Sequence, residues 1–389
     1  RKYNTHENLQ ILVQLLFILV LSRLFMLVMV AVYNGAMGTD RSISFLMNEW
    51  DAKRYQFIVD NGYTYPLDYD PQANWAFFPM YVIVCAFVKL LTFWKADTYW
   101  VGMVVSNVCI YVAAFVAVKY IRNITRERAD KDVFLIGFLM FAAPYTFYCA
   151  SMYTEAMFIM FIALFFYFCQ RKKFFTAGVM AAFASGTRIV GCTLVFPMII
   201  EMYRYYQPGR VTWAKLGSWI KHVLKKPVEL LSILLCPLGT FSYMAFLRFF
   251  CGDVWAFLSV QIAWREDKYF PVLGVLWKAC TGQIEPRYTY MGWFCIGVFI
   301  MYGYMIYRKH YSMGIFGIIS LLVPLASHVM STCRFTIGSF VIFIGFYDLL
   351  VRMRGTTVKN WLRRIIIAGF IVAETVLLFL WYNSDCWLM

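Results

Sequence analysis

The sequence predicts an all-α protein that crosses a membrane many times. Of its 389 residues, 62% are hydrophobic, 20% are aromatic and only 15% are charged. The mean hydropathy is +0.63. Apolar runs of about eighteen or more residues, enough to cross a hydrocarbon core of ~30 Å as helices, recur along the chain. The composition therefore excludes a soluble protein, although the length alone would suit two soluble domains.

Apolar segments follow one another along almost the whole chain. Two longer polar stretches interrupt them, at 34–76 and 251–288, and both contain aromatic residues, charges, glycine and proline. In the first stretch, residues 51–61 have the spacing of a short amphipathic helix, and Asn61-Gly62 is a stop signal. The predicted apolar segments are 9–33, 77–94, 98–120, 132–150, 152–170, 174–187, 189–203, 229–250, 289–307, 312–331, 335–351 and 363–382.

The positions of lysine and arginine predict the number of crossings. The net charge is +15, but the basic residues form short clusters between apolar segments, which is typical of cytoplasmic loops and argues against nucleic-acid binding. If residues 77–94 only dip into the outer face, the large basic loops all fall inside with the N-terminus, which gives about eleven crossings and an outer C-terminus. If 77–94 is an ordinary span, the same loops fall outside, which violates the rule that basic loops stay on the cytoplasmic side. These loops begin at Lys119, Arg171, Arg204, Arg308 and Arg352.

A single membrane domain is expected over residues 1–389. Its parts would be a first outer loop with juxtamembrane helices (34–97), core transmembrane helices (98–250), a second outer loop (251–288) and C-terminal transmembrane helices (289–389). No cleavable signal peptide is expected, because the first apolar segment is too long for the apolar core of one. The eleven cysteines are scattered without the spacing of metal ligands, so most are expected to be free thiols.

Ionisable side chains at membrane depth are costly and rarely lack a role. The unexplained ones in this sequence collect at the predicted outer face. Asp51 follows Trp50 and precedes Lys53 and Arg54, soon after the first apolar segment. Glu155 follows the residues SMYT at the outer start of another segment.

Basic residues lie at two further outer turns. Arg188 is in the turn GTRIVG between segments 174–187 and 189–203, each of which is too short to cross comfortably at ~1.5 Å per residue. This turn should lie below the membrane surface, where an arginine needs an anionic partner. His328 and Arg334 are in the sequence SHVMSTCRF.

These residues suggest one kind of chemistry, because they share one side of the membrane. A carboxylate can act as a general base toward a hydroxyl group. Cations near the membrane surface can hold a lipid-linked phosphate and stabilise the charge on it as it leaves. Gln261 and Arg265, in the second outer loop, are further candidates for substrate binding. The aromatic side chains that could stack on sugar rings are Trp50, Tyr55, Trp75, Phe77, Phe78 and Tyr153.

Each of these residues also has a purely structural interpretation. Asp51 could pair with Arg54 along one helix face, and Arg188 could extend from a helix end to the lipid headgroups. The tryptophans and Phe78 could belong to an interfacial belt of aromatic residues, and the charged run 265–268 could be a solvated loop. The common sidedness of the group is therefore a stronger signal than any single member.

Three stretches also carry a family resemblance. WDAKRYQFIVDNGY followed by NWAFFPMY resembles a Trp-Asp pair that leads a short helix ending in Gly-Tyr, with a Phe-Phe-Pro-Leu/Met-Tyr signature after it. APYTFYCASMYTEAMF resembles a stretch ending in Tyr-Ser-Glu-Ser, and SGTRIVG resembles Thr-Arg-Ser-Asn-Gly. In this order they are similar to the PIG-V family, also called GPI mannosyltransferase II, and its bacterial relatives.

The resemblance covers about residues 9–200, and beyond them only the hydropathy and SHVMSTCRF. Two departures concern residues beside the charged positions. Thr154 and Ala156 replace the family's serines around the glutamate, and Ile189-Val190 replace Ser-Asn after Arg188. Glu155 and Arg188 themselves match the family pattern. The departures therefore affect the expected detailed contacts with the substrate and not the charged residues.

The resemblance implies a GT-C glycosyltransferase fold and a polyprenyl-phosphate sugar, such as dolichyl-phosphate mannose, as donor. Asp51 would deprotonate a hydroxyl of a glycolipid acceptor resembling a GPI precursor, and mannose would be transferred with inversion. Arg188, with His328 or Arg334, would bind the donor phosphate, while Glu155 would orient the acceptor or shape the site. Enzymes of this kind with monophosphate donors need no metal cofactor. Arg54 completes the candidates for substrate binding.

Other function classes stay open at this stage. A lipid-sugar transporter would need ionisable residues along a path through the membrane, and Arg23 and Glu374 are the few inside apolar segments. A non-catalytic subunit of a membrane complex should lack the carboxylate–arginine group. A GT-C enzyme could instead use another polyprenyl-phosphate sugar and a cell-wall polymer or protein. A bacterial host would imply the plasma membrane, and a eukaryotic host the endoplasmic reticulum membrane. Membrane lipids are expected partners, and a small membrane protein is a further candidate partner.

Overall fold

The structure is a computed structural model that describes residues 5–64, 74–125, 130–263, 272–326, 328–353 and 355–384. These residues form helices and no strand, which confirms the all-α prediction. In chain order, with η for 3₁₀ helices, they are α1 (Thr5–Met37), α2 (Ile43–Met47), α3 (Asp51–Asn61), η1 (Asn74–Ala76), α4 (Pro79–Leu91), α5 (Thr98–Thr125), α6 (Asp130–Phe141), η2 (Thr146–Cys149), α7 (Glu155–Gln170), α8 (Phe174–Thr187), η3 (Ile189–Leu194), α9 (Val195–Tyr206), α10 (Trp213–Lys225), α11 (Pro227–Leu235), α12 (Leu238–Cys251), α13 (Ala256–Ser259), η4 (Val260–Ala263), α14 (Val272–Cys280), α15 (Arg287–Tyr307), α16 (Tyr311–Leu325), α17 (Thr332–Ile337), α18 (Phe340–Arg352) and α19 (Thr357–Tyr382).

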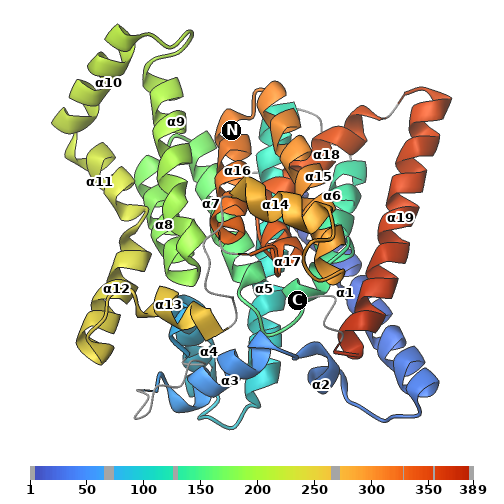
Figure 1. Cartoon of the computed structure of the whole chain (residues 1–389). Coiled ribbons are helices and arrows are strands. Elements are labelled where there is room, and N and C mark those ends of the chain that lie inside the picture. Colours follow the sequence, from blue (N-terminus) through green and yellow to red (C-terminus); the bar gives the residue numbers. More distant parts are fainter. Residues whose placement is uncertain are drawn as a thin grey trace.

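The helices form a bundle with two distinct ends (Figure 1). We call them the α3 end, where α2, α3 and α4 lie, and the α10 end, toward which α9 and α10 project. Within the described residues, α1, α5, α15 and α19 are long and apolar enough to cross a membrane, and the bent pair α11–α12 would make a fifth crossing. These helices are those of a polytopic membrane protein, and the higher number of crossings stays a prediction.

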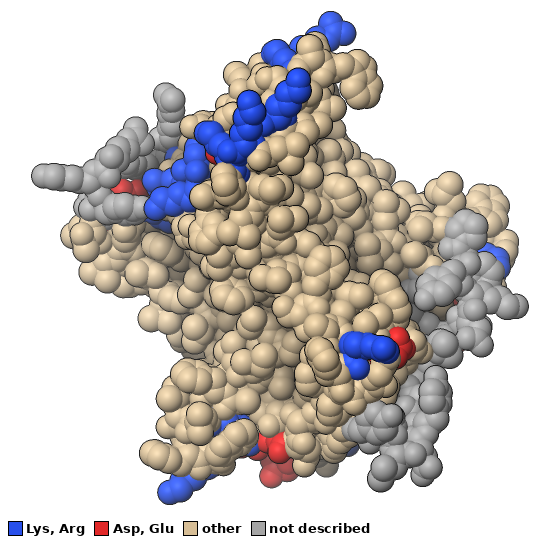
Figure 2. Space-filling model, turned by 90° about the vertical axis from the view of Figure 1, so that its left-hand side faces the viewer, with Lys and Arg blue, Asp and Glu red and all other residues tan. Residues whose placement is uncertain are grey.

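Charged side chains separate the two ends. Figure 2 shows lysine and arginine gathered at the upper end, and a broad uncharged surface between them and the charged residues at the lower end. Residues 204–226, which include α10, contain six of these basic residues and no acidic one. The helices below them expose apolar side chains such as Leu231, Leu234 and Phe241. An apolar surface of this extent suits a hydrocarbon layer rather than water.

Helix α4, which corresponds to the predicted segment 77–94, runs back along the first turns of α5. The hydroxyl of Tyr81 is 2.9 Å from Ser106 Oγ, whereas Lys89 Nζ is 2.7 Å from Thr98 Oγ1. The later residue of α4 thus contacts the earlier residue of α5, so the two helices are antiparallel. Helix α4 therefore runs toward the beginning of α5, and whether segment 77–94 crosses the membrane stays a prediction.

Three of the predicted apolar segments are not continuous helices. Segment 132–150 ends as α6 at Phe141 and continues through a turn into η2. Segment 229–250 bends by 59° between α11 and α12, and segment 335–351 is divided between α17 and α18 at Gly338. Pro144, Pro237 and the pair Gly338-Ser339 lie at these breaks, although the predicted segments run through them. Two of these breaks lie next to the candidate site described below.

The break after α6 is stabilised by the two charged residues inside long apolar helices. Arg23 of α1 donates from Nη1 to Phe141 O (3.3 Å) and from Nε to Asn107 Oδ1 (2.7 Å). Glu374 of α19 is buried and accepts a bond of 3.4 Å from Thr146 Oγ1. Inside hydrocarbon, polar groups that a break releases must find partners within the protein. Arg23 supplies one for the last carbonyl of α6, and Glu374 fixes the other side of the break.

Glycine lets α8 and α12 approach closely. A Cβ atom at Gly239 of α12 would collide with the carbonyl oxygen of Ala182 and the backbone of Gly186. The Ser185 hydroxyl accepts a hydrogen bond from Gly239 N at 3.0 Å. Small residues at such contacts are typical of helices that pack within membranes. The contact fixes the last turn of α8, from which Arg188 follows.

We expect Gly239→Ala to destabilise the protein by about 1–3 kcal/mol, because the added methyl group overpacks the contact with α8. The measurement is thermal unfolding of the purified protein in detergent. Gly217 of α10 has open space around the corresponding Cβ position, so Gly217→Ala is the matched control and should not lower the Tm. Equal Tm values for the two variants would contradict the close approach.

Candidate functional site

The stretch before α3 is docked on the loop that leads into α7. Asn48 Oδ1 accepts a hydrogen bond from Met152 N (2.9 Å), and the Tyr153 hydroxyl donates to Glu49 O (2.7 Å). Ser106 Oγ of α5 donates to the carbonyl oxygen of Tyr153 (3.2 Å). All of these groups are buried. The first part of α3 and the first part of α7 are therefore held together by polar bonds to the backbone.

Asp51 is the first residue of α3, as the sequence predicts. Its neighbour Trp50 has a φ of 57°, which is uncommon for a residue other than glycine and makes the chain turn sharply into the helix. A carboxylate in the first helical turn is favoured by the helix dipole. The Asp51 side chain is 33% exposed, so it is open to a molecule that binds at this end.

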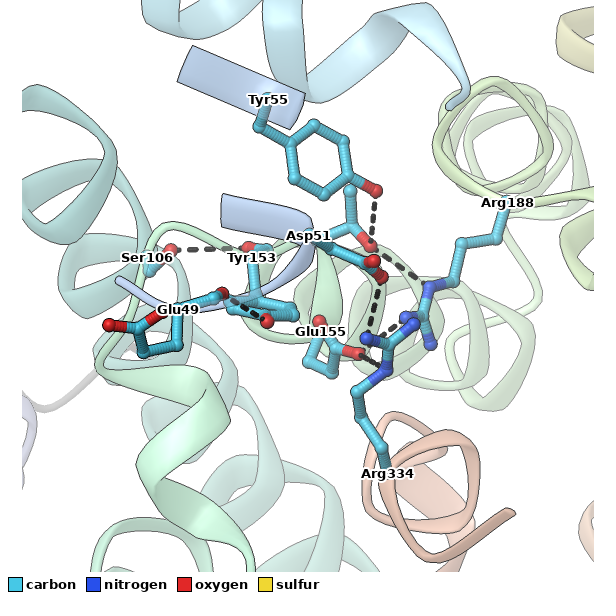
Figure 3. Close-up of polar contacts among 9 residues, drawn as sticks. Glu49, Asp51, Tyr55, Ser106, Tyr153, Glu155, Arg188 and Arg334 are labelled. Atoms are coloured by element: carbon cyan, nitrogen blue, oxygen red, sulfur yellow. Dashed lines mark hydrogen bonds and ion pairs between the residues drawn. The ribbon is translucent and has the colours of Figure 1, made fainter. Parts of the chain in front are cut away.

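Two arginines and two carboxylates form the centre of the site (Figure 3). Glu155, the first residue of α7, is fully buried, and its Oε1 is 2.5 Å from Arg188 Nη2 and 3.1 Å from Arg334 Nε. Arg334 Nη1 is also 2.6 Å from Asp51 Oδ2. We call these four residues the carboxylate–arginine cluster. They come from α3, α7, the turn after α8 and α17.

Neighbouring groups fix the orientation of Arg188. Its Nε donates to Thr154 Oγ1 (3.0 Å), and its guanidinium lies over the rings of Phe158 and Phe335, 5.8 and 5.3 Å from their centroids. A Cβ atom at Gly338 would lie 2.8 Å from Arg188 Nη1. The break between α17 and α18 thus brings the backbone close to the arginine at a residue without a side chain.

Aromatic rings also surround Arg334. The centroids of Phe335, Tyr153 and Tyr148 are 5.1, 5.3 and 5.8 Å from its guanidinium carbon. Burial lowers the pKa of Arg334, but the charges of Asp51 and Glu155 outweigh this effect and hold the pKa well above its ordinary value. Both carboxylates therefore keep this buried arginine charged.

The cluster is closed on one side and open on the other. The side chains of Arg188 and Arg334 are each 14% exposed, whereas Glu155 is not exposed at all. Among the described residues, Arg188 Nη1 and Arg334 Nη2 make no hydrogen bond. With two positive and two negative groups, the cluster is formally neutral. It can therefore offer N–H donors to an anion on the same side as an accessible carboxylate.

Most of the aromatic candidates pack into the interior. Phe77 and Phe78 are 8% and 5% exposed, and Tyr55 and Tyr153 are buried as well. The Tyr55 hydroxyl is 3.5 Å from Thr154 Oγ1, and burial raises the pKa of Tyr55 well above its ordinary value. These four rings support α3 and α4 and do not present a free face to a sugar.

The two tryptophans, Trp50 and Trp75, are half-buried, and stacking on a sugar stays a prediction for them. Trp75 Nε1 donates to Thr64 O (3.1 Å). The buried Trp50 Nε1 has no hydrogen-bond partner among the described residues. The exposed part of Trp50 is therefore not its indole N–H.

Other predicted residues have local roles in the structure. His328 Nδ1 accepts a bond from Met330 N (2.9 Å), and the imidazole lies edge-on to Tyr288. Gln261 Nε2 donates to Phe257 O (3.3 Å). Arg54 is half-buried on α3, and Arg265 lies outside the described residues. Within the described part of the chain, no three His, Cys, Asp or Glu side chains could together hold a metal ion.

Sequence reasoning missed a buried lysine that fixes the far end of α3. Lys89 Nζ of α4 is 2.6 Å from Asp60 Oδ1 and 2.7 Å from Thr98 Oγ1. The Thr98 hydroxyl donates to the same Asp60 oxygen (2.6 Å). A lysine inside an otherwise apolar segment was the available signal. Helix α3 is thus tied to α4 and α5 at one end and to the cluster at the other.

The comparisons with known proteins give a distant match. No known protein-family model matches the sequence. GPI alpha-1,6-mannosyltransferase 2 of Rattus norvegicus is 23% identical over 235 residues, which cover 59% of this chain and 46% of the rat protein. The match thus spans about half the length of that relative. The chain is distantly similar to a mannosyltransferase, at a level that leaves its own donor and acceptor to be proposed.

We expect Glu155→Gln to destabilise the protein by about 3–5 kcal/mol, because it leaves two buried arginines with one partner fewer. Thermal unfolding in detergent is the measurement. The matched control is Glu285→Gln, since Glu285 pairs with Arg287 at 2.6 Å but is 61% exposed, and exposed pairs contribute about 0–1 kcal/mol. A loss of Tm for Glu155→Gln no larger than that of the control would contradict a structural role of Glu155 between the arginines.

Proposed function

We propose that the protein is an inverting hexosyltransferase of GT-C fold, with about eleven crossings as the positive-inside rule predicts. It moves mannose from a polyprenyl-phosphate mannose donor to a hydroxyl of a glycolipid acceptor. The observation that carries this proposal is the accessible carboxylate of Asp51 in the carboxylate–arginine cluster, where it pairs with Arg334. Its helix α3 lies at the end of the bundle opposite the basic α10 end (Figure 1). The distant similarity to a GPI mannosyltransferase supports it.

The cluster residues have distinct proposed roles in the transfer. Asp51 takes the proton of the acceptor hydroxyl while that oxygen bonds to the anomeric carbon, on the face opposite the phosphate. The bond from the anomeric carbon to the phosphate oxygen breaks, and its electron pair leaves with the polyprenyl phosphate. Arg188 and Arg334 stabilise the added negative charge there. Glu155 is fully buried, so it acts as a positioning residue for the arginines. The proposed reaction uses no metal cofactor.

The proposed topology follows from the same arrangement. The α10 end would face the cytoplasm, together with the N-terminus, and the α3 end would face the outside or the lumen. The first outer loop (34–97) would then carry the base, with α3 and α4 as its juxtamembrane helices, and residues 251–288 would form the second outer loop. In a bacterium the membrane would be the plasma membrane, and in a eukaryote the endoplasmic reticulum.

A transporter has less support than an enzyme. The two intramembrane charges that could mark a transport path are Arg23 and Glu374, and both bind groups at the break after α6. They stabilise the fold there and do not form a line through the bundle. A GT-C enzyme with another polyprenyl-phosphate sugar, and with a cell-wall polymer or protein acceptor, uses the same chemistry. Competition of other polyprenyl-phosphate sugars against labelled polyprenyl-phosphate mannose would separate the donors, and a panel of acceptors would separate the acceptors.

We expect the purified protein to transfer radiolabelled mannose from a short-chain polyprenyl-phosphate mannose to a glycolipid in the presence of EDTA. Asp51→Asn should lower this rate by about 10²-fold to 10⁴-fold, the usual contribution of a general base. Asp40→Asn removes the same charge from an exposed residue at the α3 end and should keep the wild-type rate. Turnover by Asp51→Asn at the rate of Asp40→Asn would rule out Asp51 as the base.

A further inference from the structure

We infer that the donor phosphate binds Arg334 in the place that the Asp51 carboxylate occupies, so that donor binding releases Asp51 to act on the acceptor. The inference rests on the proposed function for the nature of the anion. It adds an order of events: the base is engaged by an arginine until the phosphate arrives. The Asp51 carboxylate thus marks where a phosphate oxygen binds, 2.6 Å from Arg334 Nη1.

The charges of the cluster favour an exchange over simple addition. Two arginines face two carboxylates, so the cluster is neutral without a ligand. A polyprenyl-phosphate sugar is a phosphodiester with one negative charge. If it joined the cluster with both carboxylates in place, three anions would face two cations in a partly buried site, which is costly. If it replaces one carboxylate, the cluster stays neutral.

Only one of the carboxylates is able to leave. Glu155 is fully buried, and its Oε1 contacts both arginines. Asp51 is 33% exposed and pairs with Arg334 through Oδ2 alone. A change of its side-chain rotamer moves the Asp51 carboxylate into the open side of the site, where an acceptor would bind. The same change at Glu155 would leave a charge unpaired in the interior.

Arg334 is suited to hold either anion without moving. Its Nε stays on Glu155 Oε1 at 3.1 Å, and the rings of Tyr153 and Phe335 fix the guanidinium plane. The two Nη atoms then face the open side, and one of them, Nη2, has no hydrogen bond among the described residues. A guanidinium binds two oxygens of a phosphate in this way. Arg188 Nη1 lies unbonded nearby and can bind a further oxygen.

The test measures binding of geranyl phosphate, a short analogue of the polyprenyl phosphate, to the purified protein in detergent, by calorimetry and without any sugar transfer. It is run at about pH 5, where a phosphate monoester carries about one negative charge, as the donor phosphodiester does. Asp51→Asn should bind it about tenfold more tightly than the wild type, a common coupling for groups in direct contact. Glu49→Gln removes a nearby charge that pairs with Lys53 and not with an arginine of the cluster. It should change the affinity less than twofold, because only general electrostatics is altered.

A double-mutant cycle ties the effect to Arg334. In the background of Arg334→Gln, where Arg188 still pairs with Glu155, Asp51→Asn should give no gain in affinity. Inorganic phosphate is the second probe, and the variants should rank in the same order with it, since the exchange concerns the anion and not the lipid. The inference is overturned if Asp51→Asn and Glu49→Gln have equal effects, if the gain persists without Arg334, or if neither probe binds.

The binding and transfer experiments distinguish a failure of the exchange at Arg334 from a failure of the proposed function. If Asp51→Asn binds geranyl phosphate more tightly but no sugar donor supports transfer, the exchange at Arg334 is supported and the proposed function is not. If mannose transfer is observed but Asp51→Asn shows no gain in affinity, the function is supported and the exchange is wrong.

Discussion

The buried carboxylate of Glu155 is the contact on which the site depends. Its Oε1 lies between Arg188 and Arg334, and an arginine in this interior would be costly without such a partner. Through the arginines it joins α7 to the turn after α8 and to α17, and through Arg334 it reaches Asp51 on α3. Elements far apart in the sequence thus meet at one carboxylate oxygen.

Arg23, Glu374 and Lys89 follow the same rule, because each one stabilises a place where the helical bundle is interrupted. Arg23 and Glu374 bind the two sides of the break after α6. Lys89 joins the ends of α3, α4 and α5. In a membrane, irregular backbone is tolerated only where the protein itself satisfies its polar groups. The charged residues inside apolar segments therefore support the irregular region that forms the site.

Much of this arrangement could be predicted from the sequence, since its signals are local. The short helix from Asp51 to Asn61 has amphipathic spacing and a glycine stop, and it forms as expected. Asp51, Glu155, Arg188 and Arg334 stood out because charge is rare in apolar surroundings, and the structure brings all four together.

The remaining features depend on contacts between distant residues. Asp51 has Arg54 as a basic neighbour in sequence, yet its ion pair in the structure is with Arg334, and one sequence contains no information on such a pairing. Phe77 and Phe78 have the composition of a sugar platform but are buried by packing against Tyr55 and Tyr243. The sequence around Gly338 contains polar residues such as Thr336 and Ser339. The close contact of Gly338 with Arg188 joins residues far apart in the sequence, so hydropathy could not predict it.

A site for an anionic lipid in a low-dielectric region has to be stable before its ligand arrives. Two arginines without partners would repel each other, and their loss of hydration would cost free energy. The empty site therefore needs two negative charges of its own. One of them must be permanent, or the arginines would not be held, and the other must be exchangeable, or no ligand could bind. Glu155 meets the first requirement by burial and Asp51 the second by exposure. In the proposed exchange, the counter-ion that leaves Arg334 is also the proposed base, so the arrival of the donor phosphate would free Asp51 for the acceptor hydroxyl.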